Sequence, residues 1–156
     1  MKQSLLLIII AFLAGALAMQ LWQSRDNKAK SLQLLTTPAN KELGLPFSEA
    51  TRIGNTLYVS GSIGVKPGTL ELVAGGIKEE TRQTMDNIRT VLERYGSSMD
   101  EVAKCTIFLG DMSEWPLMNE AYVAAFGSHR PARSAFGANG LALNGSVEID
   151  CIAYVE

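Results

Sequence analysis

One arginine and one glutamate, fifteen residues apart, are of the types that could act together on a small substrate. The run RPARS at 130–134 delivers Arg133 to the start of a predicted strand, and VEID at 147–150 places Glu148 on a second one. The planar guanidinium of arginine binds a carboxylate through two parallel hydrogen bonds. This pair would therefore suit a small anionic substrate. The alternative is that both are solvated surface residues without a chemical role, as charged pairs on strands commonly are.

Composition bounds the class of protein. The 156 residues, with a formal net charge of −2, fit one domain plus an appendage. The charge argues against a nucleic-acid binder, which usually carries a basic stripe. Cys105 and Cys151 each lie among apolar neighbours at period two, which predicts two buried free thiols. His129 is predicted to be a solvated loop residue, and with two strand cysteines it does not make a zinc site.

The N-terminal segment is an unbroken apolar run at 5–19. A signal peptide cleaved after Ala18 is one interpretation. A membrane anchor with Trp22 at the interface is the other. Both predict a cell-envelope location, exported or anchored; an uncleaved anchor followed by basic residues could instead hold the domain on the cytoplasmic face of the membrane. We therefore divide the chain into residues 1–30, a signal peptide or membrane anchor with a polar tether, and 31–156, the folded domain.

The hydrophobic pattern of residues 31–156 predicts short strands interrupted by two helices. The clearest element is a helix over 77–95, with apolar residues at steps of three and four and Gly96 as its left-handed cap. A second helix covers 114–126. Strands are predicted at 31–35, 50–53, 56–60, 70–73, 103–109, from 132 and at 146–155.

This order of elements predicts an α+β domain, with two helices packed on one face of a mixed sheet. The face without helices is half polar and half apolar, which favours contact with another copy of the chain. Its predicted members are Thr56, Tyr58, Ser60, Glu148, Asp150 and Ile152.

Six short motifs are distributed along this domain. They are LPFSEA at 45–50, GNTLYVSG at 54–61, TRQTMDNI at 81–88, MNEAY at 118–122, PARS at 131–134 and VEI at 147–149. Together they resemble the RidA family of imine/enamine deaminases. The resemblance runs from about residue 31 to residue 156 and leaves out the N-terminal apolar segment.

The resemblance implies a chorismate-mutase-like α+β fold, assembled as a homotrimer with active sites in clefts between subunits. It implies that Arg133 holds the carboxylate of a 2-imino or 2-enamino acid. It implies that Glu148 positions or activates the water that attacks the imine carbon, releasing ammonia and a 2-oxo acid. No metal or organic cofactor is implied. The other positions that match the family's substrate pocket are Phe47, Ser60, Gly61, Asn119 and Ala135.

The sequence departs from the family pattern near this pocket. Phe47 stands where a tyrosine is frequent, Ser62 where a glutamine is frequent and Ala135 where some members have a cysteine. These changes affect the expected choice of substrate more than the reaction type. The alternative functions are a carboxylate-binding module without turnover and a chaperone-like module of the same fold.

Overall fold

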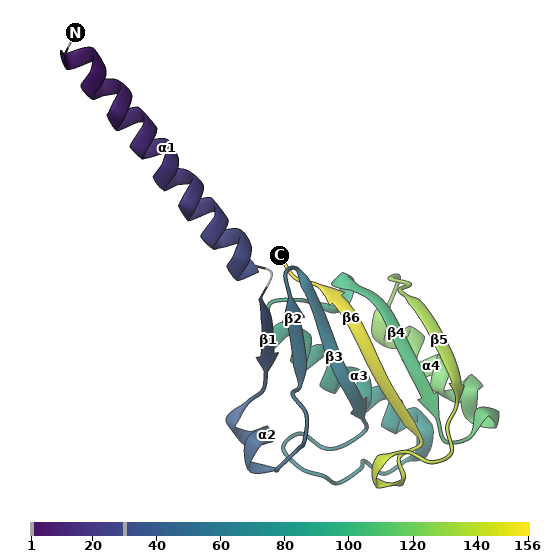
Figure 1. The fold of residues 1–156 in the computed structure, drawn as a ribbon. Helices are drawn as coiled ribbons and strands as arrows, with labels where there is room; N and C mark the ends of the chain where they lie inside the picture. Colours follow the sequence, from purple (N-terminus) through teal and green to yellow (C-terminus); the bar gives the residue numbers. More distant parts are fainter. Residues whose placement is uncertain (1, 30) are drawn as a thin grey trace.

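The computed structural model describes residues 2–29 and 31–156, with side chains for 10–24 and 31–156. Within these residues a six-stranded sheet forms the centre of the domain, in the order β1-β2-β3-β6-β4-β5 (Figure 1). Neighbouring strands are antiparallel except β4 and β5, which are parallel. The strands are β1 (Leu32–Leu35), β2 (Ala50–Ile53), β3 (Thr56–Ile63), β4 (Val102–Leu109), β5 (Ala132–Gly137) and β6 (Val147–Tyr154).

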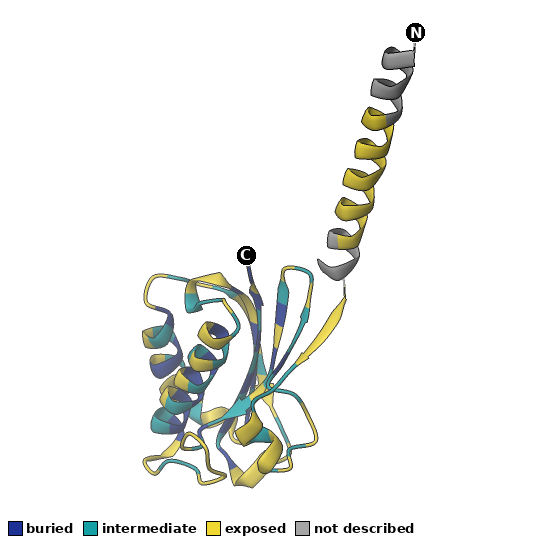
Figure 2. Cartoon of the chain, turned by 90° about the vertical axis from the view of Figure 1, so that its left-hand side faces the viewer, coloured by how far each residue is buried: buried dark blue, intermediate teal, exposed yellow. Residues whose placement is uncertain are grey.

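Two helices, α3 (Gly76–Arg94) and α4 (Trp115–Phe126), pack on one face of this sheet, and the other face is open (Figures 1 and 2). The apolar stripe of α3 supplies much of the core, because Ile77, Met85, Ile88 and Leu92 are buried against the sheet. The predicted α+β class and the predicted positions of both helices are confirmed. The shorter elements are α2 (Pro38–Glu42), η1 (Met99–Glu101), η2 (Met112–Glu114) and η3 (Ala142–Asn144).

The strand predicted at 70–73 does not form. This segment makes only one isolated antiparallel bridge, between Val65 and Leu72. Instead it folds back on the chain just before it, since the Lys66 N–H donates to the Glu71 carbonyl oxygen and the Val73 N–H to the Gly64 carbonyl oxygen, both at 2.9 Å.

Strand β6 shows how the sheet separates its two faces. Val147, Ile149, Cys151 and Ala153 are buried toward the helices, and the intervening Glu148, Asp150 and Ile152 are partly exposed on the open face. This alternation follows from the period of two in a strand.

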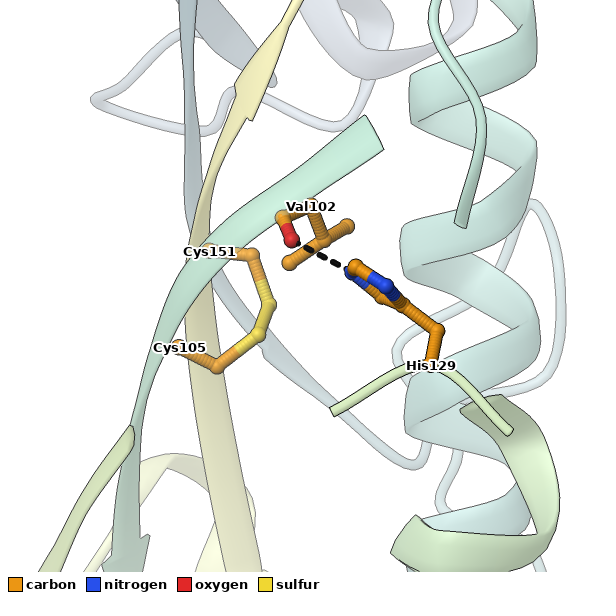
Figure 3. Close-up of a disulfide and its surroundings, with 4 residues drawn as sticks. All are labelled: Val102, Cys105, His129 and Cys151. Carbon is orange, nitrogen blue, oxygen red and sulfur yellow. Dashed lines mark hydrogen bonds between the residues drawn. A yellow bond between two sulfur atoms is a disulfide. The ribbon is translucent and has the colours of Figure 1, made fainter. Parts of the chain in front are cut away.

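The two cysteines form a disulfide, so the prediction of free thiols is wrong. Cys105 on β4 and Cys151 on β6 are register partners, with Cα atoms 4.1 Å apart and sulfur atoms 1.98 Å apart (Figure 3). Residues directly opposite one another in an antiparallel pair are close enough to be bridged. The sequence pattern indicated that each thiol is buried, but the register that brings them together is long-range.

His129 is half-buried rather than solvated. Its Nε2 donates a hydrogen bond to the Val102 carbonyl oxygen at 2.7 Å, beside the disulfide (Figure 3). This bond ties the chain that leaves α4 to the start of β4.

The N-terminal helix α1 (Lys2–Ala29) extends away from the domain (Figure 1). No helix among residues 2–29 and 31–156 combines the length and the apolar character that a membrane span requires. The apolar run at 5–19 is shorter than the roughly 20 residues needed to cross the hydrocarbon core. Neither the signal peptide nor the membrane anchor is supported, and the predicted cell-envelope location is contradicted.

Candidate functional site

Arg133 lies on β5 and points to the helix-covered side of the sheet. Its register partner on β4 is Cys105, which is buried on that side. The Arg133 guanidinium carbon is 5.1 Å from the centroid of the Tyr122 ring on α4, a cation–π contact. Burial raises the pKa of Tyr122, and the positive charge of Arg133 partly opposes that rise.

Arg133 lines a hollow of about 420 Å³ between β5 and the start of α4. The turn before α4 is held by Asp111, whose carboxylate accepts a hydrogen bond from the Ser113 backbone N–H at 2.8 Å. Asn119, one helical turn into α4, lines the same hollow, so the structure brings together two of the predicted site residues. The remaining lining residues are Met112, Ser113, Trp115 and Pro116.

Most arginines in the described part of the chain are engaged by other groups. Those residues are Arg82, Arg89 and Arg94, which pair with carboxylates, and Arg52 and Arg130, which donate to backbone carbonyls. Arg133 forms no ion pair with any described carboxylate. Its guanidinium is exposed to the hollow and keeps its donors for a ligand.

Glu148 lies on β6 and points to the open face. Burial raises the pKa of Glu148, and repulsion by the nearby Asp150 carboxylate raises it further. Its carboxylate rests over Gly61 of β3, where a Cβ atom would lie 2.1 Å from Glu148 Oε1. Gly61 sits within the register shift between Val59 and Ser62, so the missing side chain and the irregular ladder together make room for the carboxylate.

Ser60 precedes Gly61 on β3 and is hydrogen-bonded to the segment that carries Phe47. Ser60 Oγ donates to the Ser48 carbonyl oxygen at 2.7 Å, and the Ser60 backbone N–H donates to the Glu49 carbonyl oxygen at 3.0 Å. These bonds fasten the segment that carries Phe47 to β3. The Phe47 side chain is 52% exposed.

The side chain of Glu49 also anchors the segment that carries Phe47. Its carboxylate accepts hydrogen bonds from Asn40 Nδ2, Arg94 Nη1 and the Tyr95 hydroxyl, at 2.7 to 2.8 Å. Burial, followed by the hydrogen bond to Glu49, raises the pKa of Tyr95 to about 12. A partly buried hydrogen-bond network thus helps to hold the segment that carries Phe47.

The predicted residues fall into two groups on opposite faces of one sheet. Arg133, Asn119 and Ala135 lie on the helix side, where Ala135 also packs against the core. Glu148 lies on the open face, beside its register partner Phe108. Within one protomer the structure therefore does not bring Arg133 and Glu148 together.

Glu80 on α3 is a buried carboxylate that the sequence analysis did not single out. Its two oxygens accept hydrogen bonds from the Ser146 backbone N–H at 2.7 Å and the Ser146 hydroxyl at 2.9 Å. These bonds fix the chain two residues before Glu148. The sequence contained a signal for the burial of Glu80, because this residue lies three positions after Ile77 and four before Thr84, and both of these are buried.

Comparison with known proteins identifies the family. The family model described as Endoribonuclease L-PSP matches residues 40–155. A RutC family protein of Pyrococcus horikoshii is 42% identical over 123 residues, covering 79% of this chain and 97% of that protein. A protein of Dermatophagoides farinae named 2-iminobutanoate/2-iminopropanoate deaminase is 36% identical over 124 residues, covering 80% and 97%. The crystal structure of RidA from an Antarctic Psychrobacter species has a TM-score of 0.69 at 34% identity, covering 78% and 94%.

The chain belongs to this family, whose members include proteins named RidA and deaminases of 2-imino acids. The resemblance found in the six motifs is thereby confirmed. The family match begins at residue 40 and so leaves out the N-terminal helix α1.

Proposed function

We propose that the domain at 31–156 hydrolyses 2-imino and 2-enamino acids to 2-oxo acids and ammonia. The observation that carries the proposal is the unpaired Arg133 guanidinium at the edge of a partly apolar hollow. A guanidinium with free donors recognises a carboxylate, which every 2-imino acid presents next to its reactive carbon. The family names give the same reaction for relatives at about 36% identity.

In the proposed reaction Arg133 holds the substrate carboxylate and Glu148 acts on water. Ionised Glu148 accepts a proton from a water molecule as the water oxygen attacks the imine carbon, and the C=N π electrons move to nitrogen. That proton then passes to nitrogen and gives a neutral carbinolamine. Ionised Glu148 next carries the hydroxyl proton to nitrogen, the C–N bond breaks as the C=O bond forms, and ammonia leaves. The raised pKa of Glu148 favours this role, because a general base works best when its pKa approaches the working pH.

A complete site of this kind needs two protomers. Arg133 and Glu148 lie on opposite faces of one sheet, so we propose that Arg133 of one subunit meets Glu148 of the next in a homotrimer. The open face supports such assembly, because three large aromatic side chains, Tyr58, Phe136 and Tyr154, are exposed on it.

The first test measures how fast the Arg133→Ala variant hydrolyses 2-iminobutanoate and 2-iminopropanoate. Both imines are generated in the assay mixture from the corresponding amino acids. Losing two charge-assisted hydrogen bonds should lower kcat/KM by roughly 100-fold or more. Arg82→Ala is the matched control, because it removes an exposed arginine whose ion-pair partner is Glu79, away from the hollow's lining residues. Wild-type turnover in Arg133→Ala, with assembly intact, would refute the assignment.

The second test mixes two inactive variants, Arg133→Ala and Glu148→Ala. If each site takes one residue from each of two protomers, subunit exchange should restore about a quarter of the sites. No recovery after verified exchange would mean that the two residues do not act across subunits.

The same hollow could serve a receptor that binds a 2-oxo or 2-imino acid without turnover. Arg133-dependent binding of 2-oxobutanoate, together with no release of ammonia from the imine, would establish that function instead. Binding to RNA is not favoured, because the net charge of −2 gives little attraction to a phosphate backbone.

A further inference from the structure

The hollow that contains Arg133 has one cationic end and a mainly apolar wall. Trp115 and Met112 are 40% and 39% exposed, and both line the hollow together with Pro116. An indole and a thioether exposed side by side form an apolar surface that a ligand could cover. Such a site is complementary to a small anion that carries a large apolar group.

We propose that this wall selects 2-imino acids with large apolar side chains, aromatic ones above all, and that Trp115 is the main determinant. The inference rests on the proposed function and names its substrate class. With its carboxylate on Arg133, a substrate would direct its side chain along Trp115 and Met112.

The size of the hollow agrees with this substrate class. About 420 Å³ lies in the range of roughly 300–1,000 Å³ that holds drug-sized ligands. A substrate with a methyl side chain would leave most of the wall uncovered. An aryl side chain would cover it and could pair with the indole ring in an offset or edge-to-face arrangement.

The fold also holds the residues of this apolar wall in fixed positions. Met112 lies against β5, where a Cβ atom on Gly137 would come 3.1 Å from Met112 Cγ. The absence of a side chain at Gly137 therefore makes room for the Met112 side chain. Trp115 is the first residue of α4, and Pro116 follows it in the first turn, where proline is well tolerated. The apolar wall is therefore held by backbone structure at both of its ends.

Asn119 adds a polar group at the base of the hollow. Its Oδ1 atom is buried and has no hydrogen-bond partner among the described residues. The wall thus combines one arginine, one amide and an apolar surface, which is the usual make-up of a specific small-molecule site.

The test compares kcat/KM for the imines of phenylalanine, leucine and alanine in the wild-type protein and in Trp115→Ala. The wild type should prefer the phenylalanine imine over the alanine imine by about tenfold or more. Trp115→Ala should reduce that ratio about tenfold, mainly by raising KM for the aromatic imine, and Met112→Ala should reduce it less. Trp115→Phe should keep most of the preference.

Leu117→Ala is the matched control, because Leu117 is 47% exposed on the same helix but does not line the hollow. A ratio that is near one in the wild type, or that Leu117→Ala changes as much as Trp115→Ala does, would overturn the inference. Loss of assembly on size-exclusion chromatography in Trp115→Ala and Met112→Ala would also overturn it, by showing that a second copy covers this wall. Absence of turnover for all three imines in the wild type would instead overturn the proposed function.

Discussion

The Gly61→Ala substitution tests whether the Glu148 carboxylate acts in the reaction. The added Cβ would lie 2.1 Å from Glu148 Oε1 and 3.0 Å from its Cδ, whereas ordinary contact begins at 3.4 Å. The carboxylate must therefore move by roughly 1 Å, a displacement that can cost about 100-fold in rate. The backbone at Gly61 is not in the left-handed region, so alanine causes no strain there.

The expected result is a fall in kcat of about 100-fold for 2-iminopropanoate, with KM nearly unchanged. KM should hold because Arg133, the proposed carboxylate-binding group, is on a different strand and face. Thermal unfolding should shift little, since a compatible glycine-to-alanine change alters stability by only about 0.4–1 kcal/mol.

Gly110→Ala is the matched control, because its Cβ would lie 3.5 Å from the Gly145 carbonyl oxygen, an ordinary contact. The reasoning fails if Gly61→Ala keeps the wild-type kcat with its fold and assembly intact. If the two changes act through one group, Gly61→Ala should have no further effect on kcat once Glu148 is alanine. The reasoning therefore also fails if Gly61→Ala still lowers kcat by the same factor in the Glu148→Ala background.

Two further predictions concern the charge and the disulfide of strand β6. Asp150→Asn should shift the acid limb of the kcat–pH profile to lower pH. Removing a like charge lowers the pKa of Glu148, and this base must be ionised to act. An acid limb that stays in place would contradict this prediction. Reduction by dithiothreitol should lower the free energy of unfolding by roughly 2–4 kcal/mol, because the Cys105–Cys151 bridge closes a loop of 46 residues in the unfolded chain. Two free thiols in the native protein without reductant, measured by thiol titration, would count against the bridge.

The local elements could be predicted from the sequence. The stripe of apolar residues at steps of three and four is a property of neighbouring positions, so α3 and its terminal Gly96 were predicted close to their observed places. The same holds for strand β6, whose alternation is visible in the chain. Six short motifs, two of which contain Arg133 and Glu148, were enough to indicate the family.

The placement of the strands and helices relative to one another could not be predicted from the sequence. Period-two alternation shows which residues of one strand share a face, but it does not show which face another strand will present to them. For this reason the sequence did not show that one protomer holds Arg133 and Glu148 on opposite faces of the sheet. The bridge between Cys105 and Cys151 was missed for the same reason, since register depends on long-range pairing.

By itself, the sequence determined that this protein contains an α+β domain of the RidA family, with an arginine and a glutamate as its candidate reactive groups. The tertiary structure decided that Arg133 shares a hollow with Trp115 and Asn119, and that Glu148 rests on Gly61 on the other side of the sheet. The physical reason is that local periodicity depends on adjacent residues, whereas faces, registers and hollows arise only when distant strands and helices pack together.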